Sequence, residues 1–412
     1  MENPKIRFKG FTKDWEQRKL GDIYGSIGNA FVGTATPYYA EHGHFYLESN
    51  NVKDGQINHN AEIFINDEFY EKQKDKWLHT GDMVMVQSGH VGHAAVIPEE
   101  LDNTAAHALI MFRNPKEEIE PYFLNYEYQT DKAKKQIENI TTGNTIKHIL
   151  ASDMQEFVVD IPKYEEQKVI ASYFCNLDHL ITLHQRKCEQ TKKLKKYMLQ
   201  KMFPQNGAKV PEIRFDGFTY DWEQRKLNEV AEKICVGFVG TCEKFYTDES
   251  GIPMYRTGNL NGLSLNRDDL KYVTNEFHQH NQKSQLKAGD ILIARHGDSG
   301  KAVNYENSEE ANCLNIVIIR PDFKKCNYKF LTNCINSPEC QKHIKSLSAG
   351  STQAVINTSE IEKLGVVIPA NIDEQNRIAR YFSTLDHLIT LHQRKCDELK
   401  KMKKYMLQNM FI

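Results

Sequence analysis

Two pairs of nearly identical segments divide this chain into two copies of one plan. Residues 4–20 (PKIRFKGFTKDWEQRKL) return as residues 211–227 (PEIRFDGFTYDWEQRKL), with 14 of 17 positions identical. Residues 177–203 return as residues 385–411 with 22 of 27 positions identical. Self-similarity at a fixed spacing is typical of a repeated structural unit. The 412 residues therefore predict two similar units rather than several unrelated domains.

The stretches between these matching segments have diverged. A few residues keep equivalent places in the two copies: Gly81-Asp82 and Gly289-Asp290, Gly89 and Gly297, Gly92 and Gly300, Gly143 and Gly350, Pro162 and Pro369. Matching flanks indicate that both copies do the same job there. Divergent middles on a shared glycine pattern indicate one fold that presents two different surfaces. Duplication without a division of function is the alternative.

The second matching segment predicts a long helix in each copy. From about Glu165 the apolar residues alternate at spacings of three and four, which is the pattern of a coiled-coil seam. The predicted seam residues are Leu177, Leu180, His184, Leu194 and Met198, with Leu385, Leu388, His392, Leu399 and Met406 in the second copy. Two similar seams in one chain most simply bury each other as an antiparallel pair. A helix of about 35 residues spans roughly 50 Å, enough to separate two modules by one turn of DNA, roughly 34 Å.

The charge of the chain is nearly balanced overall and uneven locally. A formal net charge of -2 excludes indiscriminate binding of polyanions through wholesale positive charge. Residues 177–203 carry a net charge of +5 and residues 385–411 of +3, which leaves -10 for the remainder. The basic helices are compatible with DNA passing near them, and a solvated helix face is the alternative interpretation.

Composition also bears on compartment and partners. Nine cysteines form no C-x-x-C pair and are odd in number, which favours reduced thiols over a disulfide framework or a zinc site. No apolar run approaches the length of about 20 residues that crosses a bilayer, and the first residues lack a signal-peptide pattern. We expect a cytoplasmic protein without a membrane partner.

The middles predict α+β domains rather than a Rossmann sheet. Short apolar runs bounded by turn residues predict strands at residues 83–86, 108–112, 291–293 and 316–319, and residues 120–140 read as helical. The expected organisation is a first domain over residues 1–160, a first helix and linker over 161–207, a second domain over 208–367 and a second helix over 368–412.

Polar residues between the retained glycines are candidate DNA contacts. Hydroxyl, amide, imidazole and cationic side chains can bond phosphates and base edges, and ordinary polar turns are the alternative. The loop after the Gly-Asp turn and strand supplies Gln87, Ser88, His90 and His93 in one copy, and Arg295, His296, Ser299 and Lys301 in the other. A second segment supplies Asn144, Thr145, Ser351, Thr352 and Gln353, and a third, weaker set is Asn50, Asn51, Arg256 and Asn259.

No catalytic or metal-binding residue is predicted. The chain lacks a P-loop, H-E-x-x-H, G-x-S-x-G, a Rossmann G-x-G-x-x-G and the Asn/Asp-Pro-Pro-Tyr motif of enzymes that methylate exocyclic amines in DNA. Asp160 with Glu166 and Lys168 superficially matches a nuclease set. Asn376 replaces the lysine in the second copy, and both sets open a predicted helix, so this interpretation is rejected.

The order of variable domain, long helix, variable domain, long helix resembles the specificity subunit of type I restriction-modification systems, over nearly the whole chain. The pieces that carry the resemblance are F-x-G-F-x-x-x-W-E-x-R-K-L at 8–20 and 215–227, the Gly-Asp turn with its glycine loop, Gly-Ser-Thr-Gln at 350–353, and Ile-Pro followed by Glu-Gln before a Leu-Asp helix at 161–178 and 368–386. In the first copy the Gly-Ser-Thr-Gln segment becomes Gly143-Asn144-Thr145-Ile146, without the glutamine.

The resemblance implies a non-catalytic DNA-recognition protein with an internal pseudo-two-fold repeat. Each target-recognition domain would read one half of a bipartite, asymmetric site in double-stranded DNA, and the paired helices would set the gap. The flanks would bind two methyltransferase subunits that modify adenine N6, and restriction/translocase subunits would join them. S-adenosylmethionine, ATP and Mg would belong to those partners, so no cofactor is expected on this chain. A stand-alone DNA-binding regulator and a coiled-coil protein-interaction scaffold are the alternatives.

Overall fold

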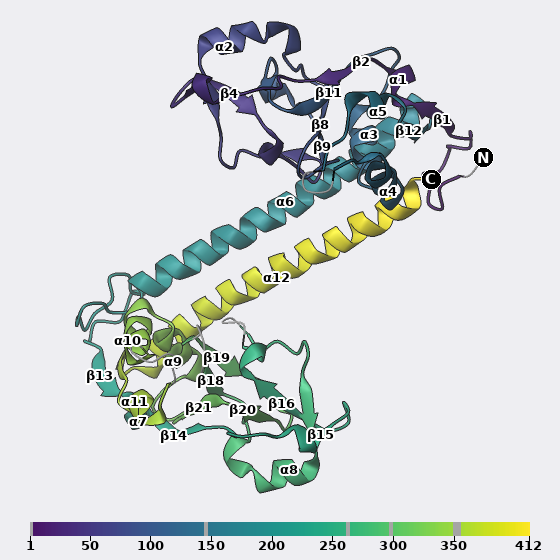
Figure 1. The fold of residues 1–412 in the computed structure, drawn as a ribbon. Helices are drawn as coiled ribbons and strands as arrows, with labels where there is room; N and C mark the ends of the chain where they lie inside the picture. The colour runs from purple at the N-terminus through teal and green to yellow at the C-terminus, as the bar shows by residue number, and fades with distance from the viewer. Residues whose placement is uncertain (1–2, 144–146, 261–263, 296–299, 349–355) are drawn as a thin grey trace. The chain divides into compact units, whose positions relative to one another are not determined.

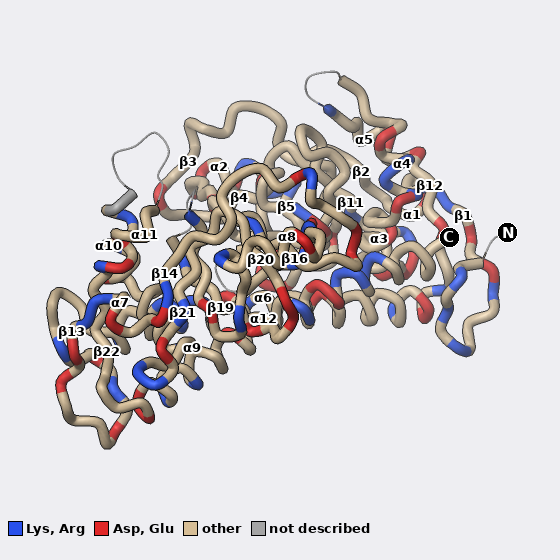
Figure 2. Tube along the Cα trace, turned by 90° about the horizontal axis from the view of Figure 1, so that it is seen from below, with Lys and Arg blue, Asp and Glu red and all other residues tan. Residues whose placement is uncertain are grey.

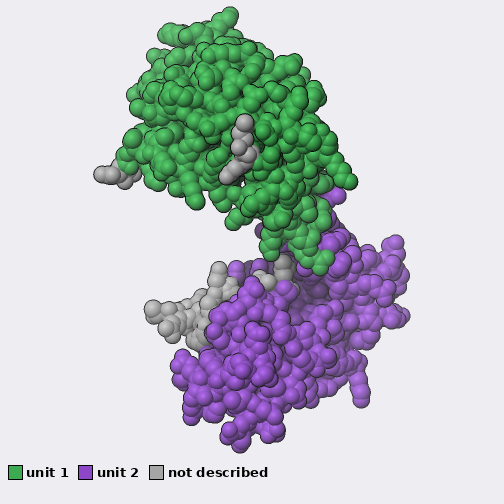
Figure 3. Space-filling view, turned by 90° about the vertical axis from the view of Figure 1, so that its right-hand side faces the viewer, with its two compact units in different colours: residues 1–184, 394–412 green, residues 185–393 purple. Residues whose placement is uncertain are grey.

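The chain forms two compact units, each built from segments far apart in the sequence. The structure, a computed structural model, describes residues 3–143, 147–260, 264–295, 300–348 and 356–412. One unit contains residues 1–184 and 394–412, and the other contains residues 185–393 (Figure 3). The division passes through the middle of both long helices. It therefore differs from the sequence-based boundaries, which gave each helix a segment of its own, because the two ends of one helix pack on different domains.

The domain of the first unit is centred on a four-stranded antiparallel sheet (Figure 1). Its strand order is β2-β11-β8-β9, with bounds Tyr24–Asn29, Leu109–Pro115, Met83–Val86 and Ala94–Val96. A second four-stranded sheet has the order β10-β4-β7-β3, with bounds Ala105–Ala106, His44–Leu47, Phe64–Ile65 and Tyr39–Ala40. A short hairpin joins β5 (Val52–Lys53) to β6 (Gln56–Ile57), and α2 spans Asp67–Lys72.

The second unit repeats both sheets although its sequence has diverged. Its central sheet has the order β14-β21-β18-β19, with bounds Ala231–Val236, Ile316–Pro321, Asp290–Ala294 and Ala302–Tyr305. Its other four-stranded sheet has the order β20-β16-β17-β15, with bounds Asn312–Leu314, Ile252–Arg256, Lys271–Val273 and Tyr246–Thr247, and α8 spans Asn275–His280. Each strand occupies the position of its counterpart in the first unit. The two domains are therefore α+β copies of one topology.

The uninterrupted apolar runs form strands because both faces of the central sheet are covered. Successive side chains of a strand point to opposite faces. Met83 and Met85 of β8 belong to one buried cluster, and Val84 and Val86 belong to another. In β18, Ile291 and Ile293 likewise separate from Leu292. A strand with two buried faces needs no polar alternation, so the runs at 83–86 and 291–293 are correctly predicted strands.

The helical stretch expected over 120–140 is two helices. The first, α3, spans Pro121–Glu127, and the second, α4, spans Asp131–Ile140. Thr130 begins α4 as its N-cap, because its hydroxyl oxygen accepts a hydrogen bond from the backbone N–H of Ala133 at 3.2 Å. The second unit has the same break between α9 (Tyr328–Ile335) and α10 (Pro338–Ser348).

The opening segment of each copy folds back onto the start of the following long helix. Strand β1 (Glu16–Lys19) pairs antiparallel with β12 (Val158–Ile161), and β13 (Glu223–Lys226) pairs with β22 (Gly365–Ile368). The short helices of this region are α1 (Leu20–Ile23), α5 (Ala151–Gln155), α7 (Leu227–Val230) and α11 (Thr358–Glu362). This packing explains why the opening and the helix are retained together while the middle varies.

The long helices are α6 (Tyr164–Lys201) and α12 (Ile372–Met410), close to the predicted ranges. Within each unit they run antiparallel. In the second unit, Cys188 contacts the carbonyl of Ile389 while Lys195, later in α6, pairs with Asp386, earlier in α12, at 2.5 Å. In the first unit, Lys403 of α12 pairs with Asp178 of α6 at 2.7 Å.

The predicted seam is wrong by one residue in places. Leu180 and Leu194 are 40% and 44% exposed, whereas Ile181 is 7% exposed. Leu177, Leu385 and Leu399 are buried, and His184, Met198, Leu388, His392 and Met406 are half-buried. Successive helical residues point about 100° apart, so choosing Leu180 over its apolar neighbour Ile181 moves the assigned position off the contact face.

Two further features concern the chain as a whole. All nine cysteines lie in the described residues and are free thiols, and eight of them are buried. No helix in the described part of the chain is long and apolar enough to span a membrane.

Candidate nucleic-acid interface

The first candidate loop of each domain connects two strands of the central sheet. In the first unit it joins β8 to β9 and carries Gln87, Ser88, His90 and His93. His90 is exposed, and the other three are half-buried. In the second unit the loop joins β18 to β19. Arg295 is half-buried and Lys301 is exposed, while His296 and Ser299 lie outside the described residues.

The second candidate segment meets the first loop in both domains. Asn144, Thr145, Ser351, Thr352 and Gln353 themselves lie outside the described residues. Their neighbours are hydrogen-bonded to the loop: the backbone N–H of Ile149 donates to the carbonyl of Gln87 at 3.0 Å, and that of Ile356 donates to the carbonyl of Arg295 at 3.1 Å. Two sequence segments that were separate candidates are thus anchored at one place on each domain.

Close packing explains the second retained glycine of this loop, Gly92 or Gly300. A Cβ atom on Gly92 would lie 2.8 Å from Cγ2 of Ile137, and one on Gly300 would lie 3.1 Å from Cγ2 of Ile344. Both glycines also have positive φ angles, 87° and 42°, where a side chain is strained. The loop is therefore held close against α4 or α10 at a position that favours glycine, while its polar residues are free to differ.

The third candidate set needs correction. Asn51 and Asn259 are both 2% exposed, and their amides bond the backbone. Oδ1 of Asn51 accepts from the N–H of Glu48 at 3.1 Å, and Oδ1 of Asn259 accepts from the N–H of Arg256 at 2.8 Å. Both side chains stabilise equivalent turns and are not available to bases in this structure.

The remaining members of that set differ from each other. Asn50 is exposed beside Asn51. Arg256 is held by Asp269, with Nη2 2.9 Å from Oδ2, so its guanidinium already has a carboxylate partner. A pattern of Asn and Arg near a turn does not reveal whether a side chain points outward or closes the turn. Here Asn51 and Asn259 close their turns, and Arg256 is held by an ion pair.

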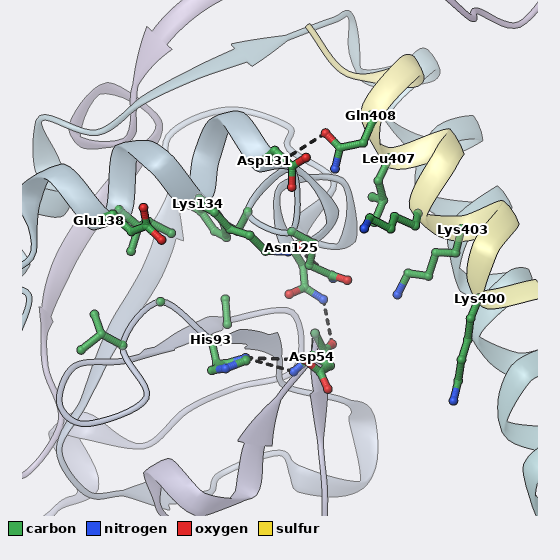
Figure 4. Close-up of a pocket in the computed structure, with 18 residues that line it drawn as sticks. Asp54, His93, Asn125, Asp131, Lys134, Glu138, Lys400, Lys403, Leu407 and Gln408 are labelled. Atoms are coloured by element: carbon green, nitrogen blue, oxygen red, sulfur yellow. Dashed lines mark hydrogen bonds and ion pairs between the residues drawn. The ribbon is translucent and has the colours of Figure 1, made fainter. Parts of the chain in front are cut away.

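A crevice of about 600 Å³ lies between the loop, α4 and the last turns of α12 in the first unit. Figure 4 shows His93 and Asp54 on one side of it and Lys400 and Lys403 of α12 on the other. Burial lowers the pKa of His93, which favours the neutral imidazole, and its Nδ1 accepts from the backbone N–H of Asp54 at 3.3 Å. Oδ1 of the buried Asn125, which also lines the crevice, has no hydrogen-bond partner among the described residues.

Helix lysines that the sequence identified as a basic face reach these crevices. Figure 2 shows that Lys and Arg recur along both long helices, with Asp and Glu interspersed. The lining residues of the first crevice include Lys400, Lys403 and Lys404, and a groove of the second unit is lined by the equivalent Lys192, Lys195 and Lys196. The basic face is therefore partly turned toward the domains. Lys342 and Lys345 of α10, which also line that groove, were not candidates. Their three-residue spacing places them on one face of that helix.

The family profile of the type I restriction modification DNA specificity domain matches this chain twice, over residues 12–193 and 220–401. The chain belongs to the type I restriction-modification DNA specificity family. It is 22% identical over 406 residues to the type I restriction enzyme MjaVIII specificity subunit of Methanocaldococcus jannaschii, an alignment that covers 96% of this chain and 91% of that protein. The EcoBI specificity subunit of Escherichia coli is 23% identical over 258 residues, which is 58% of this chain and 54% of that protein.

Solved structures of type I systems share the fold of this specificity subunit. The S subunit from M. genitalium has a TM-score of 0.69 at 14% identity, with 100% of this chain and 99% of that one covered. A chain from a structure of complex assembly and conformational transition in a type I R-M system has a TM-score of 0.53 at 18% identity, with 96% and 97% covered. The expected fold, two α+β domains with long helices, is confirmed.

The specificity subunit is a non-catalytic component with two DNA-recognition domains. The family description is of a DNA specificity domain, and the relatives are named as specificity subunits. In the parts of the chain that the structure describes, no three His, Cys, Asp or Glu side chains are grouped to hold a metal ion. Asp160 and Glu166 of the rejected nuclease set have structural partners, Lys132 and Arg7.

Proposed function

We propose that this specificity subunit reads a bipartite, asymmetric site in double-stranded DNA, with one half-site bound by each domain. The observation that carries the proposal is a pair of loops that connect equivalent strands of the central sheet in the two domains, β8 to β9 and β18 to β19. Gln87 to His93 and Arg295 to Lys301 share their glycines and differ in their polar residues. A shared glycine pattern with different polar residues between the glycines suits direct readout of different bases.

The two long helices would set the gap between the half-sites. Each helix begins on one domain and ends in the other unit, and α6 has 38 residues and α12 has 39. Helices of this length span close to 60 Å. Because the helices are continuous, insertion of residues into both would lengthen the gap without altering either half-site.

The retained flanks would bind two equivalent partners, the methyltransferase subunits that modify adenine N6. Like surfaces bind like partners, and the openings and helices are the parts that the two copies share. Restriction/translocase subunits would join the same assembly. S-adenosylmethionine, ATP and Mg would be bound by those partners, and this chain would supply specificity alone.

A domain exchange tests the division of labour. Residues 21–160 are replaced by the corresponding stretch of another specificity subunit whose methylated site is known, and the complex with the methyltransferase is sequenced for N6-methyladenine. One half of the site should change while the other half and the gap stay the same. A change in both halves, or in neither, would contradict one domain per half-site. The reciprocal exchange of residues 228–367 is the matched control and should change only the other half.

Binding with and without the methyltransferase separates this proposal from the alternatives. A stand-alone regulator would bind its site tightly and specifically by itself in a gel-shift assay. A protein-interaction scaffold would show no salt-dependent DNA affinity even in the complex. The specificity subunit should gain specific, salt-dependent affinity when the methyltransferase is added.

A further inference from the structure

A groove of about 740 Å³ in the second unit is lined by six lysines. It lies between the second half of α6, α10 and the residue that follows the retained glycine of the β18–β19 loop. We call it the lysine groove. Its six lysines are Lys192, Lys195, Lys196, Lys301, Lys342 and Lys345. No carboxylate is among the lining residues that the structure describes.

Only part of this charge is neutralised by the protein. Lys195 pairs with Asp386 at 2.5 Å, and Lys192 pairs with Glu189 at 2.7 Å. Lys196, Lys301 and Lys342 form no ion pair with any residue in the described ranges. Cations gathered in a groove repel one another and attract an external polyanion. The groove is basic although the chain as a whole carries -2.

The first unit provides an internal comparison because its crevice uses the same helical positions. Lys400, Lys403 and Lys404 are the counterparts of Lys192, Lys195 and Lys196. The domain side differs. Gly92 is followed by His93 in the first unit, and Gly300 is followed by Lys301 in the second. The isoleucine that contacts this glycine is followed by Glu138 in the first unit and by Lys345 in the second.

These differences give the two crevices different net charge. The first crevice has four lysines, including Lys134, opposed by Asp54, Asp131 and Glu138. The histidine has its pKa lowered by burial and adds no fixed charge. The second has six lysines and no opposing carboxylate among its described lining residues. Both copies share the charge of the helix lysines. The domain side offsets most of that charge in the first unit and adds to it in the second.

We infer that the lysine groove binds the phosphate backbone of DNA beside the half-site of the second domain, and that the second unit therefore supplies the larger part of the salt-dependent affinity. This inference rests on the proposed function. Lys301 belongs to the loop that the proposal places on the DNA, so DNA held by that loop passes the groove. Lysine binds phosphate as a point charge without regard to sequence, which suits a contact that orients DNA rather than one that selects bases.

The test uses the assembled complex and matched double variants. One complex carries Lys196→Gln and Lys342→Gln, and the control carries Lys134→Gln and Lys404→Gln. A third carries Lys196→Arg and Lys342→Arg, which keeps the charge. Affinity is measured by fluorescence anisotropy over a salt series, with a duplex that contains the methylated site and with a scrambled duplex.

The glutamine variant of the lysine groove should reduce the slope of log K against log salt by about 2, because each of its two lost phosphate contacts contributes about 0.9. The control should lose less than about 1, and the arginine variant should retain the slope of the unaltered complex. Both duplexes should weaken by the same factor, and the methylated site should stay the same.

Three results would overturn the inference. One is an unchanged slope for the groove variant, and another is an equal loss in the control. The third is dissociation of the methyltransferase from the glutamine variant in size-exclusion chromatography, which would assign the groove to an acidic protein surface. Failure of the proposed function is a separate result, because the unaltered complex would then show no preference for the site-containing duplex.

Discussion

Arg7 and Glu166 join the opening of the chain to the start of α6 through a two-point ion pair, with Nε 2.6 Å from Oε1 and Nη2 2.8 Å from Oε2. Arg214 and Glu374 repeat this pair in the second unit at 2.7 Å and 2.9 Å. Both glutamates are buried. The pair explains why an arginine of the opening and the Glu-Gln of the helix start are retained together, since each fixes the position of the other.

We predict that Arg7→Ala lowers the free energy of unfolding of the first unit by about 3 kcal/mol, because it leaves a buried carboxylate without its counter-charge. Urea unfolding of the full chain measures the shift. Arg225→Ala is the control. Its partner Glu223 is exposed, so the loss there should stay below about 1 kcal/mol. Equal losses in the two variants would contradict a structural role for the buried pair.

Two neighbouring residues of α6 test the corrected seam. Ile181 belongs to the buried cluster that includes Cys396 and Leu399 of α12, whereas Leu180 is exposed. Ile181→Ala should destabilise the first unit by about 2 to 4 kcal/mol through lost packing, and Leu180→Ala by less than about 0.5 kcal/mol. Thermal denaturation compares them directly. The one-residue difference in register would be refuted if Leu180→Ala were the more destabilising change.

Glu127 makes the stability of the first domain depend on pH. Burial raises the pKa of this carboxyl from 4.5 to about 8. One oxygen accepts from the backbone N–H of Asp160 at 2.9 Å, and the other has no partner among the described residues. Between these pKa values the folded state holds a proton that the unfolded state has lost, so the free energy of unfolding falls as pH rises from about 4.5 to about 8.

Glu127→Gln should remove that dependence, because the amide carries no titrating proton. Unfolding midpoints at about pH 5 and about pH 8.5 give the measurement. The unaltered chain should lose a few kcal/mol more than the variant over this range. An identical pH dependence in both proteins would show that Glu127 is ionised at neutral pH in the folded state.

The turn residue Asn51 and the loop residue His90 should differ in how their substitution affects stability and the methylated site. Asn51→Ala should lower the free energy of unfolding by about 1 to 3 kcal/mol, because it leaves backbone groups without partners, and should leave the methylated site unchanged. His90→Ala, at an exposed position in the first loop, should leave stability within about 0.5 kcal/mol and relax specificity in one half-site. A change of the methylated DNA site in Asn51→Ala would indicate that Asn51 contacts DNA.

Much of the architecture could be predicted because the sequence contains two copies of the same structural unit. The repeated segments predict two units, and the three-and-four spacing predicts α6 and α12 nearly to their bounds. The apolar runs predict β8 and β18. The predictions that were wrong concern local details of the helices. Leu180 and Ile181 are both apolar, so periodicity alone could not choose between them, and the break at Thr130 depends on a capping hydrogen bond within a helical-looking stretch.

The candidate site was predictable in its segments and not in its side chains. The glycines locate the loops, since Gly92 and Gly300 combine positive φ angles with close contacts to Ile137 and Ile344. The outward or inward direction of Asn51 depends on the fold of its turn. The convergence of Lys301 with α10 and α6 is a tertiary contact between residues far apart in the sequence, which no local pattern contains.

Sequencing of modified bases tests the central claim most directly. DNA from cells that express this chain with its methyltransferase should carry N6-methyladenine at a single motif of two specified halves separated by an unspecified gap. Cells that lack the chain are the control and should lose that motif. The account would be contradicted by the absence of any methylated motif, or by a motif that is not divided.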